Sequence, residues 1–126
     1  MKLDMDLARA ILLQAEAAPP NQFPKINLPD HDADAVAEHV QLLAEAGLLE
    51  ASIAPSGSGG RRIWKVSVKR LTWEGHQFLE NARNDTVWAK TKTVVKEKGG
   101  SASFKIIKAL LTAVTMQHFG LSGGGG

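Results

Sequence analysis

Apolar side chains recur at three- and four-residue spacings in two early segments, which is the pattern of amphipathic helices. The first segment can be capped by Asp4 and ends near Ala17. Its inward stripe consists of Ala8, Ile11, Leu12 and Ala15. The second begins at Asp30 or Asp32 and ends at Gly47. Its inward stripe consists of Ala33, Val36, Val40 and Leu43.

Prolines at positions 19, 20, 24 and 29 separate these helices and exclude a regular helix from most of the connection. Ile26 and Leu28 alternate with polar residues, so we expect a short strand at Lys25–Leu28. The prolines leave no room for the first helix of a helix-turn-helix, so that motif is expected to be degenerate.

A period of two replaces the helical period in the middle of the chain. Leu48–Ile53 is an apolar run, Pro55–Gly60 is rich in turn-forming residues, and Arg62–Val68 alternates between apolar and polar positions. This pattern predicts a β-hairpin. It leads directly into a helix that Thr72 can cap and that ends near Arg83.

Two further helices are predicted after residue 84, the first capped by Asp85 and the second by Ser101 or Ser103. The last helix carries apolar residues beyond the one face that a small core covers, so we expect a partner or twofold dimer contact there. Burial against the first helix would explain most of the same pattern. The residues of the expected contact are Phe104, Ile106, Ile107, Leu110 and Met116.

The element order predicts an α+β fold, namely a winged-helix domain with a degenerate helix-turn-helix and the hairpin as its wing. We assign residues 1–83 to this domain, residues 84–122 to a C-terminal helical extension packed on it or on a partner, and residues 123–126 to a flexible glycine tail. Tryptophans at positions 64, 73 and 88 are interpreted as core anchors.

Composition narrows the class of protein. A chain of 126 residues with 44% hydrophobic content suits one core. It contains no cysteine, which excludes disulfides and thiolate zinc sites and favours a cytoplasmic setting. No apolar run reaches the roughly 18 residues of a membrane span, and we expect no export signal and no membrane partner.

The net charge of +2 conceals a strong asymmetry between the two halves of the sequence. Residues 1–60 hold three basic and nine acidic side chains, a net charge of −6, whereas residues 61–126 hold twelve basic and four acidic ones, a net charge of +8. The position of charge decides what a surface attracts, so any contact with a polyanion is expected in the second half.

The second helix is a poor candidate for reading DNA, because its outward face carries no arginine or lysine. That face consists of Asp34, Glu38, Gln41 and Glu45. The basic wing is the remaining candidate, although such residues also occur simply as the solvated face of a hairpin. The residues that we expect to contact DNA are Arg61, Arg62, Lys65, Lys69 and Arg70.

No other chemistry is indicated. The histidines at positions 31, 39, 76 and 118 lack the spacing of metal ligands, and no nucleophile elbow, phosphate loop or dinucleotide-binding motif occurs. We therefore expect a protein that is not an enzyme, with no catalytic residue, metal or cofactor.

Several segments together resemble a known family. The motifs HVQLLAEAGLLEA (39–51) and RLTWEGHQFL (70–79) are similar to the junctions around the wing of bacterial winged-helix repressors. With MKLDMDLARAILL (1–13), NDTVWAK (84–90) and EKGGSASFKIIKALL (97–111), they resemble a bacterial and prophage family, domain of unknown function 2513. The resemblance implies a winged-helix fold.

Two functions from different classes follow as hypotheses. In the first, the chain is a dimeric DNA-binding transcriptional regulator of the prophage type that contacts double-stranded DNA mainly through its basic wing. In the second, it binds another protein or itself through the acidic helix and the apolar last helix, without DNA.

Overall fold

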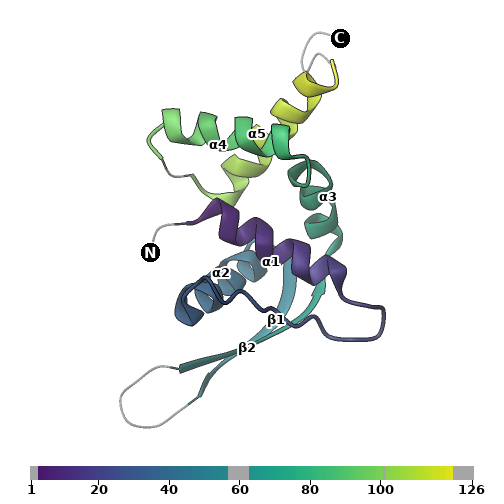
Figure 1. Ribbon diagram of the computed structural model, residues 1–126, viewed down its shortest axis with the longest axis vertical. Helices are drawn as coiled ribbons and strands as arrows, with labels where there is room; N and C mark the ends of the chain where they lie inside the picture. Colours follow the sequence, from purple (N-terminus) through teal and green to yellow (C-terminus); the bar gives the residue numbers. More distant parts are fainter. Residues whose placement is uncertain (1–2, 57–62, 101, 121–126) are drawn as a thin grey trace. The chain divides into compact units, whose positions relative to one another are not determined.

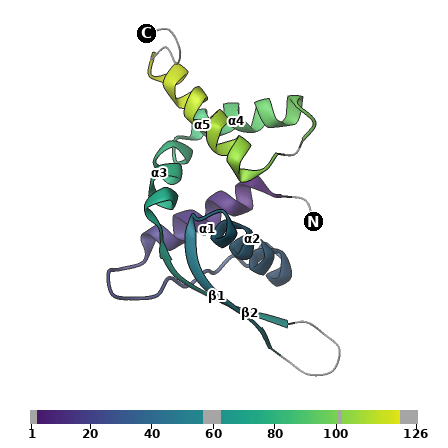
Figure 2. The same cartoon turned by 180° about the vertical axis from the view of Figure 1, so that it is seen from behind.

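The computed structural model describes residues 3–56, 63–100 and 102–120, and within the two strands it leaves aside the side chains of residues 53, 55, 56 and 63–65. The described part of the chain is α+β, as predicted: five helices and one two-stranded antiparallel sheet (Figures 1 and 2). In order, the elements are α1 (Met5–Ala17), α2 (Ala33–Glu45), β1 (Leu49–Ser56), β2 (Ile63–Leu71), α3 (Trp73–Ala82), α4 (Asp85–Glu97) and α5 (Phe104–His118).

The chain divides into two compact units. The N-terminal unit is Asp4–His76, and the C-terminal unit is Gln77–Gly126 together with Met1–Leu3. The division falls within α3, so the second half of that helix, which the sequence-based boundary after Arg83 places in the first domain, groups with α4 and α5.

In the N-terminal unit, α1 and α2 pack on each other and on the hairpin of β1 and β2. The predicted inward stripe of α1 is buried along its length, and α2 buries Val40 and Leu43. Ala33 is exposed and Val36 only half-buried, because the N-terminal turn of α2 borders an open groove instead of the core. The predicted cap Asp4 accepts a hydrogen bond from the backbone N–H of Leu7 at 3.0 Å.

A buried histidine joins α1 to α2. His39 is 2% exposed, and its Nε2 accepts a hydrogen bond from the backbone N–H of Asp4 at 2.9 Å. An amide N–H only donates, so the ring proton must lie on Nδ1, which donates to the carbonyl of Ala35 at 2.8 Å. His39 is therefore a satisfied structural residue that holds the start of α1 against α2.

The expected short strand at Lys25–Leu28 does not form, since β1 and β2 are the only strands of the described residues. The segment is extended, but it is paired with a side chain instead of a strand. The Gln14 amide donates to the carbonyl of Asn27 at 2.8 Å and accepts from its backbone N–H at 2.7 Å. Both backbone groups of Asn27 are thus satisfied by α1.

In the C-terminal unit, α4 packs on α5 around an aromatic cluster. The ring of Phe78 meets the edges of Trp88 and Phe104, with ring centroids 6.4 Å apart in both pairs. Trp88 is 3% exposed, so its predicted role as a core anchor is confirmed. Asn84, and not Asp85, caps α4 by accepting from the N–H of Val87 at 3.0 Å.

Candidate nucleic-acid interface

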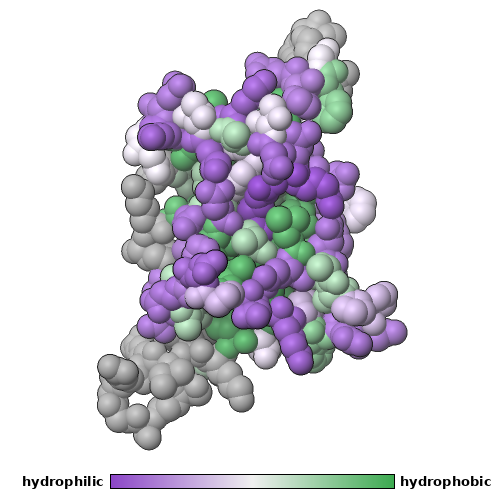
Figure 3. All heavy atoms as spheres, viewed as in Figure 1, coloured by the Kyte–Doolittle hydropathy of each residue, from purple (hydrophilic) through white to green (hydrophobic). Residues whose placement is uncertain are grey.

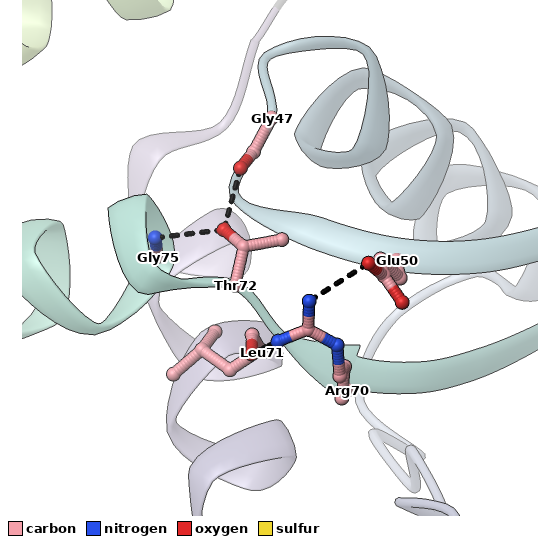
Figure 4. Close-up of polar contacts among 6 residues, drawn as sticks. All are labelled: Gly47, Glu50, Arg70, Leu71, Thr72 and Gly75. Carbon is pink, nitrogen blue, oxygen red and sulfur yellow. Dashed lines mark hydrogen bonds and ion pairs between the residues drawn. The ribbon is translucent and has the colours of Figure 1, made fainter.

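The base of the hairpin is held by Thr72, the residue between β2 and α3 (Figure 4). Its hydroxyl accepts a hydrogen bond from the N–H of Gly75 at 3.0 Å, as predicted for the cap of α3, and donates to the carbonyl of Gly47 at 2.5 Å. Its own N–H donates to the carbonyl of Leu48 at 3.1 Å. One residue therefore fixes the end of β2 to the turn that leads from α2 into β1.

A β-bulge interrupts the pairing close to this base. Glu50 lies opposite Arg70 and Ala51 opposite Val68, so Lys69 is an extra residue with no partner across the ladder. Because the bulge shifts the alternation of side chains by one position, Val68 and Leu71 are both buried, at 3% and 5% exposure, while the two basic residues between them are both exposed. The bulge thus presents Lys69 and Arg70 to solvent as neighbours.

Lys69 and Arg70, the two basic residues at the bulge, differ in their hydrogen bonds and ion pairs. Arg70 donates to the carboxylate of Glu50 at 2.8 Å and to the carbonyl of Leu71 at 3.2 Å (Figure 4). The side chains of Arg70 and Glu50 are more than half exposed, so the pair contributes little stability but lowers the local positive charge. Within the described residues, Lys69 makes no ion pair, and its side chain is exposed.

The structure does not describe the side chains of the other three predicted wing residues. Arg61 and Arg62 lie outside the described residues. Lys65 lies on β2 opposite Ala54, and its side chain is outside the description. Of the five residues predicted to contact DNA, the described part therefore brings together Lys69 and Arg70. Their contact with DNA stays a prediction.

The outward face of α2 is acidic, as the helical period predicts. Asp34, Glu38 and Glu45 are exposed, and Gln41 is partly covered. Gln41 is the residue of this face whose amide suits hydrogen bonding to a base edge. Its amide nitrogen lies 3.5 Å from a carboxylate oxygen of Glu45, so Glu45 already accepts its hydrogen bond. An acidic surface works against binding to a phosphate backbone, so we expect no DNA contact from this face.

Trp73 was predicted as a core anchor, and this prediction is wrong, because the side chain is 71% exposed. The apolar face of α3 consists of Phe78, Leu79 and Ala82, and a rotation of 100° per residue places Trp73 opposite it. The helical period, applied to α3 alone, could have shown this. The exposed indole comes shortly after Lys69 and Arg70, at the first position of α3.

The residues of α5 that were predicted to contact a partner differ in their exposure to solvent. Ile107 is 1% exposed and belongs to the core of the C-terminal unit, and Phe104, Leu110 and Met116 are partly covered. Ile106 is 51% exposed, and it is the large apolar residue of the set that remains open to a partner.

The described residues give no support for a metal site or a membrane-spanning helix. Among the described residues, no group of three or more histidine, cysteine, aspartate or glutamate side chains is placed to hold a metal ion. Apart from the buried His39, the histidines at positions 31, 76 and 118 are exposed. Within the same residues, no helix combines the length and apolar character that a membrane crossing requires.

Comparison with known proteins identifies the family. The model of the family described as "Hypothetical protein (DUF2513)" matches residues 2–101, so the chain belongs to the DUF2513 family. An uncharacterized protein of Haemophilus influenzae (strain ATCC 51907 / DSM 11121 / KW20 / Rd) is 36% identical over 121 residues, which cover 93% of this chain and 98% of that protein. No solved structure matches the chain.

Proposed function

We propose that this protein is a winged-helix DNA-binding protein whose hairpin, residues 49–71, acts as the wing and contacts the phosphate backbone of double-stranded DNA. The order of α1, α2, an antiparallel hairpin and α3 supports the winged-helix assignment. In this proposal the protein is a cytoplasmic, prophage-type regulator of transcription, and it catalyses no reaction.

The observation that carries the proposal is the bulge at Lys69. Without it, strict alternation from the buried Val68 would place Arg70 on the inner face of the hairpin. With it, two cations lie next to each other on the solvent side of a β-ribbon, which suits contact with phosphates more than with base edges. The acidic face of α2 then makes the wing the part of the N-terminal unit that can approach a duplex.

We expect the wing variant Arg61→Ala, Arg62→Ala, Lys65→Ala, Lys69→Ala to lose DNA affinity and salt dependence. Each lost phosphate contact lowers the slope of log affinity against log salt by about 0.9. Fluorescence anisotropy with a labelled 20-base-pair duplex, from about 50 to 200 mM salt, measures this slope. Arg70 is kept because Glu50 already pairs with it, so its replacement would remove less positive charge from the wing.

The matched control removes the same charge from the C-terminal unit. Lys90, Lys96, Lys98 and Lys105 are all exposed, and their replacement by alanine also removes four positive charges. We expect this control to keep most of the wild-type slope. The proposal is overturned if the wild type ignores the duplex at the lowest salt, or if both variants lose affinity equally.

A second candidate function, self-association, is favoured by the outer face of α5. Ile106, Ala109, Ala113 and Met116 are spaced three, four and three residues apart, as in the seam of a coiled coil, and all but the partly covered Met116 are exposed. Helix α5 contains no acidic residue, and its two lysines lie near its N-terminus. An antiparallel pair would separate the lysines of the two copies and place them near the partner helix's C-terminus, where cations are favoured.

We expect Ala113→Glu to abolish such a dimer, because it places a carboxylate in the middle of the seam. Sedimentation equilibrium should show a wild-type dimer and a folded monomeric variant. Thr93→Glu on the exposed side of α4 is the control and should leave the dimer intact. A monomeric wild type at about 100 µM, a concentration at which a contact of 1 µM affinity would be nearly saturated, would exclude self-association through α5.

A further inference from the structure

A hollow of about 540 Å³ lies beside the base of the hairpin in the N-terminal unit. The proline-rich segment 18–24, which follows α1, forms one side of it, and residues 69–71 at the end of β2 form another. In Figures 1 and 2 this segment loops out past the end of α1 and returns along the hairpin. The hollow therefore joins residues of the wing to a loop that the DNA-binding proposal does not use.

A β-turn at Pro19–Gln22 shapes this loop. The backbone N–H of Gln22 donates to the carbonyl of Pro19 at 3.2 Å, and Asn21, the third residue of the turn, has a φ of 68°. A proline in the second place and a positive φ in the third are the marks of a type II turn, and asparagine tolerates such a φ better than most residues do. The loop is anchored after the turn, because Pro24 is buried.

Between the turn and this buried proline, one large aromatic side chain lies in solvent. Phe23 is 72% exposed. In the direction of view shared by Figures 1 and 3, hydrophobic side chains reach the surface among hydrophilic ones over the N-terminal unit, so exposure alone does not indicate a site. The position of Phe23 is more informative, because its side chain lines the same hollow as the basic residues of the bulge.

The charges of the hollow come mainly from the wing. Its titratable lining residues are Glu16 of α1, Lys69 and Arg70 of β2, and His76 of α3. Arg70 is paired with Glu50, whereas Lys69 makes no ion pair within the described residues. If Lys69 binds a phosphate of DNA, as the proposed function requires, the sugar and base attached to that phosphate lie at the hollow.

An aromatic ring close to a phosphate-binding lysine suits one kind of contact with a duplex. Apolar side chains such as phenylalanine enter the minor groove and wedge between neighbouring base pairs, while cations beside them neutralise phosphates. A wedge on an ordered loop loses less conformational entropy on binding than one on a flexible loop. The type II turn and the buried Pro24 give the loop this order.

We propose that Phe23 wedges between two base pairs of the DNA from the minor groove, while Lys69 binds a phosphate of the same duplex at the other side of the hollow. The inference rests on the proposed function, because it uses the duplex that the wing contacts. It also gives the protein a sequence preference. Pyrimidine–purine steps such as TA unstack most easily, so the wedge favours a duplex that contains one.

Phe23→Ala separates this contact from the phosphate contacts of the wing. We expect it to weaken binding to a labelled duplex with one central TA step about tenfold, the effect of losing one contact between a base and an aromatic ring. The slope of log affinity against log salt should not change, because the side chain carries no charge. Lys69→Ala should instead lower that slope by about 0.9. Fluorescence anisotropy over a series of salt concentrations measures both quantities.

Two further variants serve as controls. Phe119→Ala removes the same kind of side chain from the C-terminal unit, where Phe119 is 66% exposed, and it should bind DNA as the wild type does. Phe23→Leu keeps an apolar side chain that can wedge between bases, so it should recover most of the affinity. The replaced side chains are exposed, so these changes should leave the stability of the fold almost unaltered.

The unstacking of the base step gives a second readout. A duplex in which 2-aminopurine replaces the adenine of the TA step becomes more fluorescent when that base loses its stacking. At saturating protein, we expect an increase with the wild type and with Phe23→Leu, and none with Phe23→Ala.

The results distinguish failure of the wedge from failure of the wing. If the wild type binds with a salt slope that the wing variant loses, but Phe23→Ala binds equally well or gives the same increase in fluorescence, the wedge is overturned and the wing stands. A lower salt slope for Phe23→Ala also overturns the wedge, because the loop would then act on the charged contacts. If Phe23→Ala loses affinity while the wing variant binds like the wild type, the contact at Phe23 stands and the proposed function of the wing fails. A wild type that ignores the duplex, or binds its single strands more tightly, overturns both.

Discussion

Replacing Gly75 by alanine is expected to destabilise the protein by about 3 kcal/mol, although alanine favours a helix over glycine by about 1 kcal/mol. Gly75 lies in α3, and a Cβ there would collide with the backbone oxygen of Leu48 and lie 2.8 Å from Cδ1 of Leu71. A backbone carbonyl cannot turn aside as a flexible side chain can. The start of α3 would have to move away from β1, with loss of the hydrogen bonds at Thr72.

Urea denaturation followed by circular dichroism measures the change in the free energy of unfolding. Gln77→Ala is the matched control: the residue is exposed in the same helix, so the change should stay within about 0.5 kcal/mol. The sign of the Gly75→Ala effect is decisive. If the variant is as stable as the wild type or more stable, α3 does not pack closely on the base of the hairpin at Gly75.

The second large effect is expected in the C-terminal unit. Trp88→Ala should cost about 3–5 kcal/mol, the usual range when a buried tryptophan or phenylalanine is truncated. Trp88 is 3% exposed and meets the ring of Phe78 edge-on, so the change leaves a cavity and removes an aromatic contact between α3 and α4. Stability on this scale is a large part of what a small domain has.

The same urea measurement tests this prediction when two further variants are measured beside Trp88→Ala. Trp88→Phe keeps a ring next to Phe78 and should cost clearly less than the alanine variant. Lys90→Ala, at an exposed position of α4, should have almost no effect. A loss below about 1 kcal/mol for Trp88→Ala would show that the aromatic cluster does not anchor the C-terminal unit.

Local signals in the sequence predicted the elements well, because each is encoded within a few residues. The helical stripe of α1 and its cap at Asp4 are both found in the structure, and so are the hairpin and the cap of α3 at Thr72. The acidic outward face of α2 follows from its period alone. These features depend on spacing and on side chains that bond to their own helix.

Features that depend on distant parts of the chain were predicted less well. Alternation suggested a strand at Lys25–Leu28, but a strand needs a partner, and Gln14 of α1 satisfies Asn27 instead. Trp73 was assigned to the core because tryptophan is usually buried, yet the apolar face of α3 points the other way. The missing strand depends on a distant residue, whereas the direction of Trp73 follows from the helical period of α3 alone and was missed because tryptophan was assigned to the core by residue type.

By itself, the sequence determined the α+β class, the order of helices and hairpin, and the concentration of positive charge in residues 61–126. The tertiary structure alone decided which of those charges are presented together. The bulge between Glu50 and Ala51 lets Val68 and Leu71 both reach the core, and this requirement turns Lys69 and Arg70 to the solvent side. The physical reason is that strand register is set by burial across the whole unit, whereas a sequence pattern shows only the local period.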